Sequence, residues 1–214
     1  MKIVDRDLVR HDLESRIAFA RDFLGFSKED GEALNAAAPL VAPLVAGITD
    51  AVYVHLFEYS YSSKAFFLKR NSGFEGELAS SLEAMTVDDD QIKFRKTFLS
   101  TYLKKVFGSN YEDPKTYEYM DKVAAMHTGL AGFKHREKKD PLIVDLQPMA
   151  LLLGWVEDVV LKAVLELPEE TLPIAVKIKT LRAFNKVVWL QNDLFNRYYA
   201  KNDDELAAAT AARA

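Results

Sequence analysis

His127 has the clearest capacity for chemistry in this chain, because its imidazole falls on the apolar side of a predicted helix within residues 117–133. Tyr119, Val123, His127 and Leu130 recur at helical spacing, so we expect this stripe to face the interior. A buried imidazole is a common metal ligand, although a lone histidine on an apolar face is more often an ordinary core residue. The spacing alone leaves both interpretations open.

The sequence offers few other sets of metal-binding or catalytic residues. It contains no cysteine, which excludes disulfides, thiolate-bound zinc, iron–sulfur clusters and covalent haem attachment. Its 4 histidines lack the Glu-x-x-His spacing of di-iron bundles, and no HExxH, glycine-rich phosphate loop or GxSxG is present. A zinc site formed by His127 and His135 would require the glycine-containing break between them to fold back.

Helical periodicity extends over most of the chain, and no segment shows the alternation of a strand. Ser27 and Asp30 have the spacing of a capping box, and Pro39 and Pro43 mark a junction between two helices. We predict an all-α protein with a single domain over residues 1–200 and a flexible tail over residues 201–214. The predicted helices cover residues 5–23, 28–38, 44–59, 64–69, 91–107, 117–128, 144–167 and 174–200.

Composition argues against two classes of partner. The net charge is -4, and no strong basic patch suggests a nucleic acid. The N-terminal residues lack the uninterrupted apolar core of an export signal. The most apolar stretches, residues 36–48 and 149–156, are shorter than the ~20 residues that a membrane helix needs. We therefore expect a cytoplasmic protein with no membrane or nucleic-acid partner.

The predicted helix 91–107 is aromatic on one side and basic on the other. Phe94 and Phe98 lie four residues apart, whereas Arg95 and its neighbouring lysines are expected to point to water. Tyr53 and Phe98 are candidates to face a flat cofactor opposite His127, but aromatic stripes at this spacing are usually core. The polar run 134–140 is typical of a solvated loop.

Three segments, YMDKVAAMHTG around His127, QIKFRKTFLSTYL and NKVVWLQNDLF, make the sequence similar to the protoglobin branch of the globins, including fungal single-domain members related to globin-coupled sensors. The resemblance extends from about Leu8 to Tyr199. It implies a globin fold, a three-over-three sandwich of helices, with an extra N-terminal helix at residues 5–23. It also implies haem b as the cofactor and a homodimer formed through the last two long helices.

The resemblance also implies roles for individual residues. His127 falls on the proximal iron ligand, Tyr53 on the distal tyrosine and Phe98 on the distal phenylalanine. Phe94 lies one turn before Phe98, where many globins have a distal histidine. Three further residues are expected to line the haem pocket, namely Val52, which stands where archaeal members often have tryptophan, Leu130 and Met149.

The function implied is reversible binding of a diatomic gas, O2, CO or NO, for gas binding, sensing or scavenging. A hydroxyl donor at Tyr53 is expected to stabilise a ligand that gains negative charge by about 0.5–1.5 kcal/mol. Two alternatives remain open: an enzyme that turns over nitric oxide or peroxide with electrons from a separate reductase, and a helical dimerisation module without haem. A sensor would need a separate signalling partner.

Overall fold

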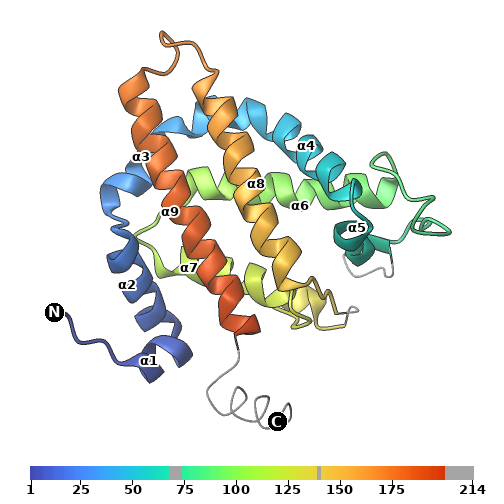
Figure 1. Cartoon of the computed structure of the whole chain (residues 1–214), viewed down its shortest axis with the longest axis horizontal. Helices are drawn as coiled ribbons and strands as arrows, with labels where there is room; N and C mark the ends of the chain where they lie inside the picture. Colours follow the sequence, from blue (N-terminus) through green and yellow to red (C-terminus); the bar gives the residue numbers. More distant parts are fainter. Residues whose placement is uncertain (68–73, 139–140, 201–214) are drawn as a thin grey trace, which may run out of the picture.

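A computed structural model describes residues 1–67, 74–138 and 141–200, and the structural statements below concern these residues. They form nine α-helices and two short 3-10 helices, with no strand, so the all-α prediction is confirmed (Figure 1). The predicted tail 201–214 lies outside the described residues. The helices are α1 (Arg6–His11), α2 (Leu13–Leu24), α3 (Lys28–Val41), η1 (Ala42–Leu44), α4 (Val45–Phe57), α5 (Ser60–Phe67), α6 (Asp90–Gly108), α7 (Pro114–Met126), η2 (Lys134–Arg136), α8 (Leu146–Leu165) and α9 (Ile174–Tyr199).

The N-terminal segment was predicted as one helix and is two, because Asp12 interrupts it. Asp12 has extended backbone angles, φ -97 and ψ 125. Its backbone N–H donates to the carbonyl oxygen of Leu8, and its carboxylate accepts from the backbone N–H of Ser15 at 2.7 Å. Asp12 therefore ends α1 and begins α2, in keeping with the preference of aspartate for the N-cap.

The proline-containing junction is more continuous than predicted. Helix α3 passes through Pro39 and ends at Val41, and the chain continues through η1 into α4. Leu34, Ala37 and Val41 are at most 1% exposed, and their packing offsets the backbone hydrogen bond that Pro39 cannot make. The prediction that this helix ends at residue 38 is wrong.

The continuous stretch Lys28–Phe57 is long and apolar enough to cross a membrane by length and composition alone. Core helices of proteins that never enter a membrane pass the same test, so this result is weak support for insertion. The short α5 begins at Ser60, earlier than predicted, and the predicted end at residue 69 lies outside the described residues. The cytoplasmic location stays a prediction.

Helix α9 is the centre of the packing. It contacts α2, α3, α7 and α8, and it runs beside α8 while α6 crosses behind the pair (Figure 1). Leu190 and Leu194 are fully buried on α9, whereas Ile178 and Trp189 on another face are 50% exposed. Helix α9 therefore supplies the core and also an apolar outer face.

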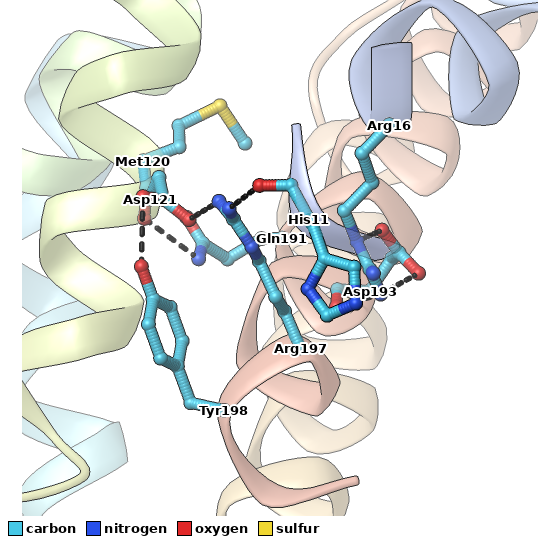
Figure 2. A network of polar contacts seen from close by, with 8 residues as sticks. All are labelled: His11, Arg16, Met120, Asp121, Gln191, Asp193, Arg197 and Tyr198. Carbon is cyan, nitrogen blue, oxygen red and sulfur yellow. Dashed lines mark hydrogen bonds and ion pairs between the residues drawn. The ribbon is translucent and has the colours of Figure 1, made fainter. Parts of the chain in front are cut away.

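A network of polar contacts fixes α7 against α9 (Figure 2). Arg197 donates to one carboxylate oxygen of Asp121 at 3.0 Å, and the Tyr198 hydroxyl donates to the other at 2.8 Å. Gln191, buried in the same interface, donates through Nε2 to the carbonyl oxygen of Met120 at 3.2 Å. Asp121 and Met120 belong to the last two turns of α7, so these contacts hold the end of that helix.

Two arginines attach the N-terminal helices to α9 (Figure 2). Arg16 of α2 donates to both carboxylate oxygens of Asp193, at 2.7 and 2.8 Å. Arg197 also donates to the carbonyl oxygen of His11, the last residue of α1, at 3.0 Å. The additional N-terminal element implied by the resemblance is therefore present, as two short helices docked on α9.

Candidate functional site

Helix α7 places His127 at its carboxyl end. Asp113 caps the start of the helix by accepting from the backbone N–H of Lys115 at 3.0 Å, and Pro114 occupies the first turn, where a missing N–H costs little. The helix ends at Met126, and His127 is its C-cap with φ -85 and ψ -6. The imidazole thus projects from the point at which the chain leaves the helix.

The packed face of α7 differs from the predicted stripe. Its buried residues are Tyr117, Met120, Ala124 and Ala125. Tyr119, Val123 and His127 lie on the adjoining face and are only partly buried. Leu130 is 54% exposed, so the prediction that it lies in the interior is wrong. The helix ends before Leu130, and Gly129, with φ +91, redirects the chain.

A hydrogen bond and an aromatic contact hold the His127 ring in place. Its Nδ1 lies 2.7 Å from the carbonyl oxygen of Val123. Because a carbonyl oxygen can only accept, Nδ1 carries the hydrogen and the lone pair of the neutral ring stays on Nε2. No described residue forms a hydrogen bond with Nε2. The Phe195 ring of α9 packs edge-on, with a centroid distance of 5.5 Å and an interplanar angle of 76°.

The backbone at His127 is fixed as well. Its carbonyl oxygen accepts from the backbone N–H of Val144 at 2.8 Å and from the Tyr199 hydroxyl at 3.4 Å. The same hydroxyl donates to the carbonyl oxygen of Val144. The end of α9 therefore joins the end of α7 to the segment that enters α8.

His127 is neutral at physiological pH. The pKa of His127 is lowered to about 4, chiefly by burial of the ring; the hydrogen bond to Val123 opposes this shift, and the positive charges of Arg136 and Arg95 contribute to it. A neutral imidazole with a free Nε2 and a hydrogen-bonded Nδ1 is the form in which histidine binds metals.

Tyr53 of α4 is buried, with 6% of its surface exposed. Burial raises the pKa of its hydroxyl to about 12, so the hydroxyl keeps its proton at neutral pH. Its ring packs against Phe66 of α5 at a centroid distance of 5.6 Å. No hydrogen bond joins the hydroxyl to another described residue. Tyr53 is thus a protonated donor without a partner in the described part of the chain.

Arg95 of α6 lies in the same region as Tyr53, because both side chains pack on the Phe66 ring. The positive charge of Arg95 also contributes to the lowered pKa of His127. Arg95 is only 6% exposed, and its guanidinium lies over the Phe66 ring at 5.3 Å. The prediction that Arg95 points to water is therefore wrong. Its position three residues after the fully buried Ile92 puts it on the packed face of α6.

The other predicted pocket residues are found in different environments. Val52 is 1% and Met149 7% exposed, as expected for apolar lining. Phe94 is partly buried and packs edge-on against Phe98 at 5.2 Å between centroids. Phe98 itself is 47% exposed, so it is not part of the packed core. Whether Phe98 and Leu130 contact a cofactor stays a prediction.

The segment after His127 folds back on α7. Gly132 has φ +67, and a Cβ at this position would lie 2.5 Å from the carbonyl oxygen of Lys122. The close approach brings the Phe133 ring within 5.8 Å of the Tyr119 ring. It also places η2 beside the site, where Arg136 is only 8% exposed. The prediction that this whole polar run is a solvated loop is wrong for Arg136.

Sequence reasoning missed both buried arginines. The position of Arg95 relative to Ile92 and Leu99 was a usable signal, because all three share one helical face. Arg136 gave no such signal, since its burial depends on the turn at Gly132. A zinc site formed by His127 and His135 required the segment between them to fold back, and the structure has this fold-back. The described residues nevertheless contain no group of three or more side chains able to hold a metal. The His135 ring stacks on the Phe133 ring.

The residues fit haem better than they fit a free metal ion. A single neutral imidazole with Nε2 unpaired suits an iron whose other ligands come from a porphyrin. Apolar side chains such as Val52 and Met149 suit the ring, and the unpartnered hydroxyl of Tyr53 suits a polar ligand on it. The buried guanidinium of Arg136, whose Nε has no hydrogen-bond partner among the described residues, suits a carboxylate of haem b.

Comparison with known proteins gives one family. A model of the family described as Protoglobin matches residues 13–205, which is most of the chain. No curated protein matched the chain.

Gly132→Ala tests the turn that brings η2 back to α7. We expect the substitution to lower the free energy of unfolding by about 1–3 kcal/mol, because the backbone is left-handed and the new Cβ would meet the Lys122 carbonyl. Urea denaturation followed by circular dichroism measures the change. The control is Gly47→Ala in α4, where a Cβ has no neighbour within 4 Å and alanine favours the helix. Equal stability of both variants would contradict the assigned turn.

Proposed function

Because the chain belongs to the protoglobin family, whose members are haem globins that bind gases, we propose that it holds haem b through His127 and reversibly binds a diatomic gas, with O2 best suited to its site. The observation that carries this proposal is the His127 ring, neutral and oriented by Val123, with Nε2 left without a hydrogen bond to any described residue. The globin fold with an additional N-terminal element agrees with the family.

Haem, when bound, would supply an iron atom that His127 would hold and that could bind a diatomic gas. The hydrogen bond from Nδ1 to Val123 fixes the ring rotation and makes Nε2 a better donor to iron. Phe195 restricts the same ring from the α9 side. These two contacts would keep the imidazole in one orientation toward the iron.

Tyr53 is proposed as the polar group on the gas side. Its buried hydroxyl keeps its proton, so it can donate a hydrogen bond to a ligand that gains negative charge. Carbon monoxide gains less charge and benefits less. Val52, Met149 and Phe94 are proposed to exclude water, and Phe98 and Leu130 to contact the edge of the ring.

We also propose a homodimer formed through α8 and α9, the last two long helices. These adjacent helices expose a set of large apolar side chains, Leu151, Leu161, Leu165, Ile174, Ile178 and Trp189. A Cβ added at Gly154 of α8 would meet no atom within 4 Å, so this face is open to close approach. Several exposed apolar side chains on neighbouring helices are the kind of surface that an interface between copies buries.

His127→Gly tests the axial ligand. We expect the purified variant to retain much less haem than the wild type, because the single protein ligand to iron is gone. Added imidazole should restore the Soret band, since it can occupy the space left by the ring. The control is His135→Gly, which removes an exposed histidine and should leave the spectrum unchanged. Unchanged haem content in His127→Gly would refute the assignment.

Tyr53→Phe tests the hydrogen-bond donor. Loss of one neutral hydrogen bond is expected to raise the O2 dissociation rate by roughly 2- to 10-fold. The CO dissociation rate should change by much less, because CO carries less negative charge. Stopped-flow replacement of one gas by the other measures both rates. Tyr59→Phe, at a residue that is 57% exposed, is the matched control. Equal O2 dissociation rates in wild type and Tyr53→Phe would exclude a hydrogen bond.

Trp189→Glu tests the dimer interface. A carboxylate placed in an apolar interface should weaken self-association, so sedimentation velocity should show monomers at concentrations where the wild type is dimeric. Phe23→Glu changes a residue that is 78% exposed on α2, outside the proposed interface helices, and it should leave the dimer intact. A wild-type protein that stays monomeric at all concentrations would disprove the interface.

A further inference from the structure

We propose that Arg136 binds a propionate carboxylate of haem b and thereby anchors the cofactor at the end of α7. This inference rests on the proposed binding of haem at His127. It adds a residue that the sequence gave no reason to place in the site.

The first step is the environment of Arg136. Only 8% of the residue is exposed, and its Nε is buried without a hydrogen-bond partner. Within the described part of the chain no carboxylate forms an ion pair with Arg136. Removing a guanidinium from water carries a large free-energy cost that is normally offset by an anion or by hydrogen bonds to all of its donors. The described part of the chain supplies neither an anion nor a hydrogen-bond acceptor for Nε.

The second step is the position of Arg136 relative to the site. The turn at Gly132, where a side chain would collide with α7, returns the chain so that Phe133 packs on Tyr119 and η2 follows directly. The backbone N–H of Arg136 donates to the carbonyl oxygen of Phe133 at 2.9 Å, which ties Arg136 to this turn. Arg136 is therefore a buried cation on the segment that folds back against α7, the helix that ends at the proposed iron ligand.

The third step is the chemistry of the missing anion. Haem b carries two propionate carboxylates at one edge of the ring, and a guanidinium binds a carboxylate through paired, charge-assisted hydrogen bonds. A porphyrin held by His127 would bring such a carboxylate to the same end of α7. The alternative, an arginine that braces the loop by binding backbone carbonyl groups, does not account for the unpaired Nε.

The test compares two cofactors in the full-length protein, ferric haemin and haemin dimethyl ester, whose propionates carry no charge. Haem loss is measured by transfer to an excess of a haem-scavenging apoglobin. We expect wild type to lose the ester roughly 10- to 100-fold faster than haemin, as for loss of a charged hydrogen-bonded pair. In Arg136→Gln, the rate of haemin loss should rise toward the rate at which the wild type loses the ester. The rate of ester loss from Arg136→Gln should be nearly the same as from the wild type.

Two further variants complete the design. Arg136→Lys keeps the charge and should retain most of the preference for haemin, and Arg182→Gln, which changes an exposed arginine on α9, should behave as wild type. Equal rates of loss of haemin and haemin dimethyl ester from the wild type would overturn the proposal, and this comparison needs no variant. Equal acceleration of the loss of both cofactors in Arg136→Gln would also overturn it. Failure of the wild type to take up haemin at all would instead remove the proposed function on which this inference rests.

Discussion

The hydrogen bond between His127 Nδ1 and the carbonyl oxygen of Val123 is the interaction on which the rest of the site depends. It lies in the last turn of α7, where backbone carbonyl groups have no partner within the helix and are free to accept. By occupying Nδ1 it assigns the lone pair to Nε2, and by holding the ring it decides the direction in which that lone pair points. A histidine in the middle of the helix would not find such a carbonyl available.

The position of α7 is in turn set by α9. Arg197, Tyr198 and Gln191 fasten the last turns of α7, and Phe195 and Tyr199 reach His127 itself. One helix thus supplies the core, the support for the imidazole and, through Trp189, an exposed apolar surface. A dimer contact on α9 would therefore lie on the same rigid element that supports the imidazole.

Buried positive charge is the second organising feature. Arg95 and Arg136 come from different elements, and each is at least nine-tenths buried near His127. Their charges favour the neutral imidazole, which is the form that binds iron. The Nε of Arg136 has no hydrogen-bond partner among the described residues, which agrees with a cofactor that carries carboxylates.

Much of the fold could be predicted from the sequence, because helical periodicity and local capping signals are encoded over short distances. The capping box at Ser27 and the end of α7 near Gly129 belong to this class. The break at Asp12 was missed because an aspartate within a periodic helix is also compatible with an exposed helical position. The continuation through Pro39 was missed because tertiary packing outweighed the local preference of proline.

For the candidate site, His127 and Tyr53 were predicted from the sequence together with the family resemblance. In the structure Nδ1 of His127 lies 2.7 Å from the Val123 carbonyl oxygen, and Tyr53 packs on the Phe66 ring that Arg95 also covers. The exposure of Phe98 and Leu130 could not be predicted from their spacing. Spacing shows which residues share one face of a helix, but it does not show which other elements cover that face. The burial of Arg136 depends on a turn in which Gly132 approaches α7, and such long-range geometry leaves little trace in one sequence.

The absorption spectrum of the purified full-length protein, ferrous with and without carbon monoxide, tests the central claim most directly. The proposed haem site predicts a haem complement near one per chain and conversion of the ferrous protein by carbon monoxide to a form with the sharp Soret band of histidine-ligated haem. A colourless protein that does not take up added haemin, or a carbon monoxide complex without the histidine signature, would contradict the assignment of His127 as the iron ligand.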